Sequence, residues 1–459
     1  MILARVGFAL MFAALALNAA TLTEQYKVVA ARLIDAALAD DQGWEKLSWL
    51  TDRIGNRLSG SASLEQAVAW AAETMKADGL VNVEKLPVKV PHWVRGQESA
   101  TLLEPVKRDL PMLGLGGSVG TPAGGITAEV VVVRTFDELE KLERARVAGK
   151  IVLYNEAWTG YGSTVLYRTQ GPSRAAKLGA VAVLIRSVGP VSLQTPHTGV
   201  LEYAADTPKI PAAALTVEGA ALLERLARAG SKVVVRLSME ARMLPDADSA
   251  NVIGEIRGRE KPGEVVVLGG HLDSWDVGAG AQDDGSGCIA ALQAVALIRK
   301  LGLHPRRTIR VVFWTNEENG GAGAKAYRQW AGDQVKNHVA AIEMDGGSER
   351  PLGFGLGLTG APEDVVTRAM EKAREIGKLL ERVGATEILR GGGGADIGPL
   401  MRDGVPGLGH RTVGQRYFEW HHTAADTLDK IDKQDFRMNV AALAVMAYVL
   451  ADMPGRLSD

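Results

Sequence analysis

The chain has little of what several large classes of protein require. A single cysteine among 459 residues, Cys288, excludes an intramolecular disulfide. Because 52 Lys and Arg residues face 54 Asp and Glu residues, the formal net charge is only −2, and no general basic field exists to attract nucleic acid or acidic membranes. Hydrophobic residues make up 46% and charged residues 23%, which excludes an unfolded chain. The length fits two or three domains.

The first 20 residues have the composition of an export signal. Arg5 is followed by the apolar run Val6–Leu17 and then by small residues before a polar stretch. This order predicts a signal peptide over residues 1–20, cut near Ala19 or Ala20. A permanent anchor is the weaker interpretation, because the run is shorter than the ~20 apolar residues that a membrane-spanning helix needs. We therefore expect a secreted or periplasmic protein with no stable membrane span after cleavage.

Glycine, proline and apolar spacing indicate how the rest of the chain is divided. Apolar residues have helical spacing over residues 23–80, and residues 111–125 have the composition of a linker. Strand-like and helical segments alternate from residue 127 to about 242, and a strand-like segment over residues 251–256 follows. The expected organisation is one larger domain in two pieces, 21–110 and 246–459, interrupted by an inserted domain at 111–245.

Three apolar, strand-like runs end in side chains that bind metals. The runs and the residues that follow them are Val265–Leu268 before His271, Ile309–Trp314 before Glu317 and Glu318, and Val339–Met344 before Asp345. Continuous apolar runs separated by helical stretches are typical of parallel strands buried on both faces. The predicted fold class is therefore α/β, with a mostly parallel, mixed central sheet flanked by helices. Since ligands bind outside the carboxyl ends of such strands, these side chains should face one crevice.

Two further segments add candidate ligands. Asp283 and Asp284 lie in a glycine-rich loop that could return a carboxylate to the same edge of the sheet. His421 and His422 precede the last helix. Cys288 opens an apolar helix and is expected to be a small core residue.

Histidines and carboxylates in this number suit a pair of zinc ions. Zinc binds imidazole nitrogen and carboxylate oxygen, and a catalytic zinc keeps one position open for water. Two zinc ions ~3.5–4 Å apart stabilise both sides of a tetrahedral intermediate, but their charges repel, so a shared carboxylate is needed between them. In the adjacent pair Glu317 and Glu318, one side chain can bind metal while its neighbour takes a proton from water.

Each of these residues also has an ordinary structural interpretation. A lone histidine at a strand end, such as His271, is more often a hydrogen-bonded core residue, and an acidic pair after a strand more often begins a solvated helix. The residues favour a metal site as a set, because they follow successive strands inside stretches too apolar and glycine-rich to be solvated faces.

These stretches resemble the secreted co-catalytic di-zinc exopeptidase family, which includes leucyl aminopeptidases and glutamate carboxypeptidases. The resemblance is carried by GGHLDSWDVGAGAQDDGSG, FWTNEENGGAGAKAY, EMDGG and HHTAADT, with GNRLSGS and GGGGADIGPLMRDGVPG, and spans nearly the whole mature chain. It implies the zinc exopeptidase fold, in which 21–110 and 246–459 form the catalytic domain and 111–245 is a protease-associated domain.

The resemblance also implies two zinc ions per chain and a role for each ligand. His271 and Asp345 would bind one ion, Glu318 and His422 the other, and Asp283 would bridge them. A cis peptide bond is expected between Asp283 and Asp284, as in many members of the family.

Catalytic roles follow from the same resemblance. Glu317 would be the general base and acid, and the Asp273 carboxylate would orient the ligand His271. His422 is favoured as the ligand over its neighbour His421, because the ligand precedes Thr or Ser in related proteins.

Substrate contacts are predicted at His421, Gly393 and Asp396. The last two lie in a glycine-rich loop whose alternative interpretation is a flexible turn. The EMDGG stretch departs from many aminopeptidases, which have Asn where this chain has Glu343.

The predicted function is a zinc-dependent metalloexopeptidase that hydrolyses dipeptides or terminal residues of peptides by attack of a metal-bridging hydroxide. Peptide is the expected partner, nucleic acid is not, and the resemblance allows a homodimer. One alternative is a non-catalytic receptor or binding ectodomain on the same scaffold, although this chain retains every ligand and the base. Another is a single-zinc acyltransferase like the glutaminyl cyclases. Aminopeptidase, carboxypeptidase and dipeptidase action remain open.

Overall fold

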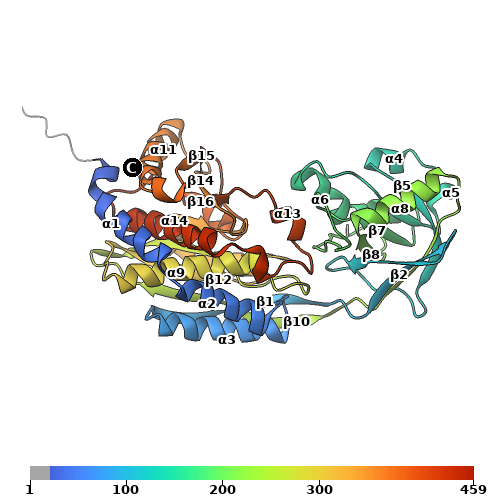
Figure 1. Cartoon of the computed structure of the whole chain (residues 1–459), viewed down its shortest axis with the longest axis horizontal. Coiled ribbons are helices and arrows are strands. Elements are labelled where there is room, and N and C mark those ends of the chain that lie inside the picture. Colours follow the sequence, from blue (N-terminus) through green and yellow to red (C-terminus); the bar gives the residue numbers. More distant parts are fainter. Residues whose placement is uncertain (1–20) are drawn as a thin grey trace, which may run out of the picture.

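The structure is a computed structural model that describes residues 21–459, so the expected signal peptide at 1–20 lies outside the described residues. Two eight-stranded sheets form the frames of two parts of the molecule (Figure 1). The first sheet contains, in spatial order, β1 (Val81–Val94), β10 (Arg242–Ile256), β12 (Arg307–Trp314), β11 (Lys261–His271), β13 (His338–Glu343), β16 (Gly407–Thr412), β14 (Pro351–Gly357) and β15 (Glu387–Arg390).

The centre of this sheet is parallel, as the apolar runs predicted. Strand β11 pairs in parallel with β12 on one side and with β13 on the other, and β13 pairs in parallel with β16. In this register His271 lies opposite Trp314, and Gly269 lies opposite Glu343. The carboxyl ends of three neighbouring strands therefore meet at one edge. Together with the second sheet, this confirms the mixed α/β fold.

Helices cover both faces of the first sheet. One face carries α1 (Leu22–Leu38), α2 (Gln42–Trp49), α3 (Ala62–Ala77), α9 (Ser286–Lys300), α11 (Glu363–Lys378) and α14 (Lys433–Asp452), and the other carries α10 (Ala322–Ala331) and α12 (Gly398–Arg402). Because side chains alternate along a strand, Val266 and Leu268 enter the core under the first group and Val267 enters the core under the second.

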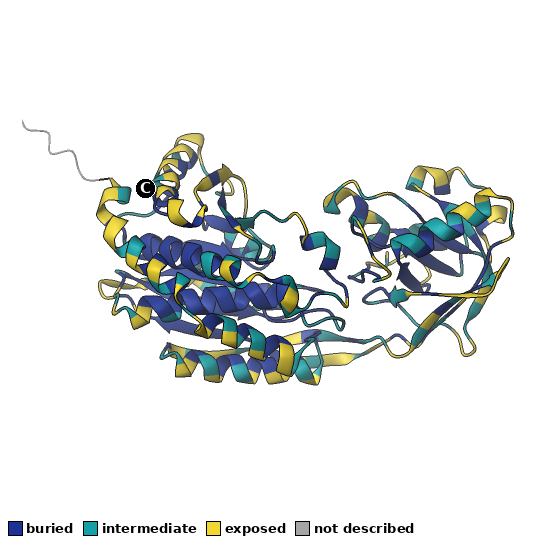
Figure 2. Cartoon of the chain, viewed as in Figure 1, coloured by how far each residue is buried: buried dark blue, intermediate teal, exposed yellow. Residues whose placement is uncertain are grey.

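Two of these helices are buried almost all round. Helices α9 and α14 are dark along nearly their whole length in Figure 2, whereas α1, α3 and α11 show an exposed face. Cys288 is fully buried in α9, in agreement with its expected place in the core. Despite the apolar character of α14, no helix within residues 21–459 combines the length and the hydropathy needed to cross a membrane.

The second sheet lies in the middle of the sequence. Its strands, in spatial order, are β3 (Arg108–Leu110), β2 (Glu98–Glu104), β9 (Val234–Met239), β5 (Ile126–Val133), β6 (Ile151–Tyr154), β7 (Ala182–Arg186), β8 (Ala212–Leu215) and β4 (Met112–Gly114). Its helices are α4 (Phe136–Glu140), α5 (Arg144–Val147), α6 (Tyr161–Thr169), α7 (Gly171–Lys177) and α8 (Val217–Arg228). We call residues 98–239, which carry this sheet, the inserted part, and the remainder the main part.

The second sheet begins earlier in the chain than the composition suggested. Residues 98–110 were expected in the larger domain, but β2 pairs antiparallel with β9 of the second sheet. Ala100 and Leu102 of β2 enter the same core as Leu237 of β9. The glycine- and proline-rich residues 111–125 therefore form loops and a short strand inside the inserted part rather than its border.

One ribbon of two strands joins the parts. Strands β1 and β10 pair antiparallel from Val81 opposite Glu255 to Val94 opposite Arg242. The chain leaves the main part along β1 and returns along β10, as Figure 1 shows. Both connections between the two parts thus run through this single hydrogen-bonded ribbon.

Candidate metal centre

The predicted ligands come from five separate segments and meet at the carboxyl edge of the parallel strands. His271 ends β11, Glu318 follows β12, Asp345 follows β13, Asp283 lies in the short turn η2 (Ala281–Gly285), and His422 follows α13 (Tyr417–Trp420). The ligand atoms of His271, Asp283 and Asp345 form one group compact enough to hold a metal ion, and those of Asp283, His421 and His422 form a second, overlapping group.

Asp283 belongs to both groups. His271 Nε2 lies 3.3 Å from Asp283 Oδ1 and 3.4 Å from Asp345 Oδ1. His422 Nε2 lies 3.2 Å from Asp283 Oδ2 and 3.0 Å from Glu318 Oε2. Each oxygen of the Asp283 carboxylate therefore faces a different histidine.

His421 lies beside this cluster, so the choice between the adjacent histidines depends on their contacts. The His421 ring stacks on His422 with centroids 3.6 Å apart, and its Nε2 lies 3.4 Å from Asp283 Oδ2. Within the described residues, only His422 of the two also approaches the Glu318 carboxylate. The geometry therefore favours His422 as the ligand, and His421 lies against the aromatic rings of Tyr161 and Tyr417.

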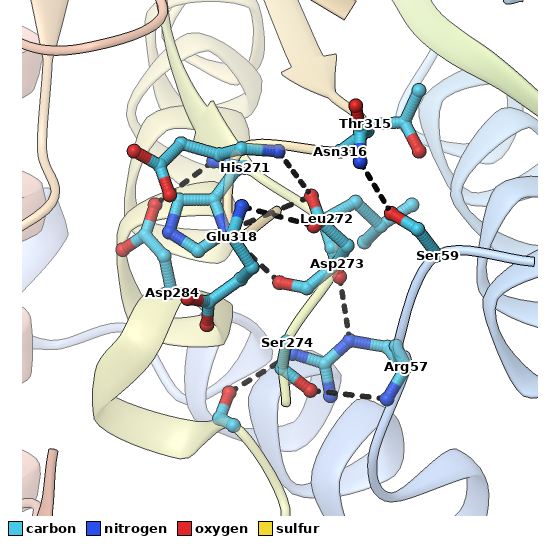
Figure 3. A network of polar contacts seen from close by, with 12 residues as sticks. Arg57, Ser59, His271, Leu272, Asp273, Ser274, Asp284, Thr315, Asn316 and Glu318 are labelled. Atoms are coloured by element: carbon cyan, nitrogen blue, oxygen red, sulfur yellow. Dashed lines mark hydrogen bonds and ion pairs between the residues drawn. The ribbon is translucent and has the colours of Figure 1, made fainter. Parts of the chain in front are cut away.

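Asp273 approaches His271 through both its side chain and its main chain. Its Oδ1 lies 3.8 Å from His271 Nδ1, whereas its backbone carbonyl lies 2.9 Å from that nitrogen. Its carboxylate instead accepts the backbone N–H groups of Glu317 at 3.1 Å and Glu318 at 3.3 Å (Figure 3). The main chain of Asp273 thus orients the imidazole, and its side chain holds the segment that carries the two glutamates.

Buried groups behind the ligands hold their backbones in place. Asp426 accepts the N–H groups of Gln282 at 2.7 Å and Asp283 at 3.2 Å, and Asp284 accepts the N–H of His271 at 3.1 Å. The peptide bond between Asp283 and Asp284 is cis, as predicted. The fully buried Arg57 donates to the carbonyl of Leu272 at 2.7 Å and to other carbonyls nearby, also seen in Figure 3.

The carboxylates and histidines perturb one another strongly. Burial opposes the charged form of His271, but hydrogen bonds with Asp283 and Asp345 raise its pKa well above the ordinary value. Burial opposes ionisation of Asp283, yet hydrogen bonds from His271 and His422 hold its pKa well below the usual range. Burial, together with the charge of Asp345, raises the pKa of Glu317 well above its ordinary value despite the opposing effect of His271. A positive charge bound among these buried acids would stabilise their ionised forms.

The donor set fits a divalent metal. Glu318 Oε1 is buried and accepts no hydrogen bond within the described residues. Buried polar atoms are nearly always hydrogen-bonded, and an unpaired one often marks an ion or water site. Imidazole nitrogen and carboxylate oxygen are ligands of zinc and related transition metals.

A cavity of about 360 Å³ opens over the ligands, within the usual range for small-ligand sites. Its walls are Asp283, Glu317, Glu318, Asp345, His421 and His422, with Tyr161, Arg168 and Val200 from the inserted part and Tyr417 and Phe418 from α13. Helix α13 lies between the two parts (Figure 1). The ring of its Phe418 stacks on Tyr161 of α6. Both parts of the molecule therefore contribute to the cavity.

Gly393 and Asp396, predicted as substrate contacts, are not among the residues that line this cavity. Asp396 is 2% exposed, and neither of its carboxylate oxygens has a hydrogen bond within residues 21–459. Its neighbour Glu343 accepts the N–H of Ile397 at 2.8 Å, and burial together with the Asp345 charge raises the pKa of Glu343 to about 7. Neither of these two buried acids lines the cavity.

The chain is similar to known peptidases along most of its length. The sequence profile of peptidase family M28 matches residues 251–447. Carboxypeptidase Q of Bos taurus is 45% identical over 415 residues, which cover 90% of this chain and 86% of the bovine protein. The crystal structure of a peptidase M28 precursor from Shewanella amazonensis superposes with a TM-score of 0.89 at 34% identity, covering 95% of this chain and 98% of that one.

A more distant structure shares the fold. A zinc aminopeptidase from Bacillus subtilis superposes with a TM-score of 0.66 at 20% identity, over 91% of this chain and 96% of that one. The resemblance inferred from the sequence motifs is thus confirmed by similarity along almost the entire length of a relative. The chain therefore belongs to peptidase family M28 and is a metallo-exopeptidase.

Proposed function

We propose that the protein is a two-zinc carboxypeptidase or dipeptidase. His271 and Asp345 would hold one ion, Glu318 and His422 the other, and Asp283 both. The observation that carries this proposal is the position of Asp283, whose two oxygens lie 3.3 Å and 3.2 Å from the Nε2 atoms of two different histidines. Zinc is the metal named for the Bacillus subtilis protein of the same fold.

The chain's own groups would handle the proton. When bound, the zinc ions polarise the scissile carbonyl and lower the pKa of water to about 7. The Glu317 carboxylate lines the cavity and makes no hydrogen bond within the described residues, so both of its oxygens are available. We assign it the general base, which takes the proton of the attacking water and returns it to the amine of the leaving residue.

Arg168 supports action at a free carboxyl terminus. It is the single Lys or Arg side chain among the described residues that line the cavity. Its guanidinium donates to the carbonyls of Thr198 at 3.2 Å and Val200 at 3.1 Å and to the Tyr161 hydroxyl at 3.1 Å, but to no carboxylate within residues 21–459. A buried guanidinium without an anionic partner can recognise the terminal carboxylate of a peptide. The name of the carboxypeptidase Q relative agrees with this polarity.

The inserted part and residues 1–20 also have proposed roles. We assign the inserted part as a protease-associated domain that shapes the cavity through Tyr161 and Arg168. We further propose that residues 1–20 direct export, so that the mature enzyme is secreted or periplasmic. A homodimer remains compatible with the resemblance to the family.

Peptides with modified ends test the proposed specificity. Wild-type enzyme should cleave dipeptides and short peptides with a free carboxyl terminus about 10- to 100-fold faster, in kcat/KM, than the same peptides with an amidated end, because a charged hydrogen bond contributes about 1.5–3 kcal/mol. Arg168→Met should remove this difference, whereas Arg174→Met, at a partly exposed arginine of the same inserted part, should preserve it. Equal cleavage of free and amidated ends by wild-type enzyme would exclude the carboxylate role of Arg168.

A further inference from the structure

The two histidines assigned to the metals are oriented from different parts of the molecule. His271 Nδ1 faces the backbone carbonyl of Asp273, only two residues along the same segment, at 2.9 Å. His422 Nδ1 faces the backbone carbonyl of Thr198, in a loop of the inserted part, at 3.4 Å. An imidazole that binds metal through Nε2 keeps its proton on Nδ1, and the acceptor of that proton sets the orientation of the ring.

A second hydrogen bond strengthens the link between the two segments. The Thr198 N–H donates to the carbonyl of His422 at 2.9 Å, so the two residues contact each other through main chain and ring. His422 has a φ of 61°, in the left-handed region that residues other than glycine rarely adopt. Such a conformation persists where the surroundings impose it, and Thr198 is one of the groups that do so.

The carbonyl of Thr198 is itself held by groups that lie outside the metal ligands. The Thr198 hydroxyl donates to the carbonyl of Gly114 at 2.8 Å and accepts from Arg95 Nη2 at 3.3 Å. Arg95 in turn binds both carboxylate oxygens of Asp276, at 2.6 Å and 2.8 Å. Thr198 has no exposed surface, and the preceding residue, His197, donates its N–H to the Ser187 hydroxyl at 3.0 Å.

From these contacts we infer that Thr198 is a positioning residue for His422, so that the inserted part completes one of the two metal sites. This inference rests on the proposed two-zinc function. The affinity for the ion at Glu318 and His422 then depends on how the inserted part docks. At the other site, with His271 and Asp345, the imidazole is oriented entirely by groups of the main part. One site is thus autonomous and the other is shared between the two parts.

Metal affinity tests this inference directly, with Zn²⁺ as the probe. Full-length metal-free protein is titrated with Zn²⁺ in competition with a chelator, and both dissociation constants are measured. Thr198→Val removes the hydroxyl that fixes the carbonyl while nearly preserving the volume, and should weaken one site about 10- to 100-fold, the usual effect of losing a group that orients a ligand. The other site should stay within about twofold of wild type, as a group outside its ligand shell has changed. Thr198→Ser, which keeps the hydroxyl, should restore both constants.

Thr308→Val is the matched control. Thr308 is buried and donates to the carbonyl of Pro262 at 2.8 Å, but it lies near the start of β12, at the end away from the ligands. Two tight sites in wild type with unchanged constants in Thr198→Val would overturn the inference and leave the proposed function intact. Binding of fewer than two ions by wild type would overturn the two-zinc proposal and, with it, the inference.

A second variant covers the case in which Thr198→Val does not fold, judged by cooperative thermal unfolding of the metal-free protein. Ser187→Ala releases the same loop one residue earlier, by removing the hydroxyl that accepts the His197 N–H. It should also weaken only one site. Wild-type constants at both sites in folded Ser187→Ala protein would overturn the inference independently.

Discussion

Replacement of Glu317 by Gln separates proton transfer from metal binding. The side chain of Glu317 makes no hydrogen bond or ion pair within the described residues, and its backbone N–H, which Asp273 accepts, is unchanged by the substitution. Glutamine has nearly the same shape and cannot take up a proton at neutral pH. The variant should therefore retain its metal and its fold, and lose turnover.

The size of the loss follows from the composition of the cavity wall. Its other three carboxylates, Asp283, Glu318 and Asp345, each approach a histidine and are assigned to the metals. No other acid lines the cavity within the described residues, so no spare base is available. General acid–base catalysis contributes about 10²–10⁴-fold, and without a substitute base we expect a fall in kcat of about 10³-fold, or about 4 kcal/mol.

The assay combines steady-state hydrolysis of a dipeptide with elemental analysis of the same preparations. Glu317→Gln should hold as much zinc per chain as wild type, and its metal-free form should melt at no lower a temperature. Glu318→Gln serves as the contrast, because it alters a side chain that lies 3.0 Å from His422 Nε2 and should lose metal as well as activity. A kcat for Glu317→Gln within threefold of wild type would refute the assignment of the base.

Three further outcomes are expected. Asp283→Ala should reduce bound zinc to one ion or fewer per chain by elemental analysis, and retention of two would exclude bridging. Phe313→Ala, in the core beneath β12, should lower the free energy of unfolding by about 3–5 kcal/mol in urea, and a loss below about 1 kcal/mol would contradict its burial. Burial and Arg310 lower the pKa of His338 from 6.5 to about 4, so its folded form stays neutral while the unfolded form binds a proton below pH 6.5. Stability should accordingly fall by about 1 kcal/mol per pH unit from this group between pH 6 and 4, and urea midpoints of His338→Phe should show a shallower slope than wild type.

The sequence predicted the core of the site because its signals are local. Each of β11, β12 and β13 contains a mostly apolar run, and parallel strands bring the residues at their carboxyl ends together wherever the intervening helices pack. His271 and Asp345 therefore fall within 3.4 Å of each other although 73 positions separate them. The positions of Asp283 and His422, in loops, came from resemblance to the family rather than from any periodicity.

Groups contributed by the inserted part had no comparable signal. Arg168 lies in a helix rich in polar residues, where an arginine ordinarily faces solvent. It is buried against the carbonyls of Thr198 and Val200 and near His422, about 250 residues further along the chain. Thr198 acts through its backbone carbonyl, which any residue possesses, so its identity carries no information about the contact with His422. The early start of the second sheet was missed for a similar reason, since β2 is recognisable only through its pairing with β9.

The ribbon of β1 and β10 has a consequence for how such a two-part enzyme arises and folds. Because its strands are hydrogen-bonded neighbours, residues 98–239 leave the main part and return to it at adjacent positions. The entropic cost of closing a loop rises by only about 0.6 kcal/mol for each doubling of its length. Additional residues placed between β1 and β10 therefore destabilise the main part very little. A compact module with adjoining ends can thus be acquired or exchanged at this point while the strands that carry His271 and Asp345 keep their register.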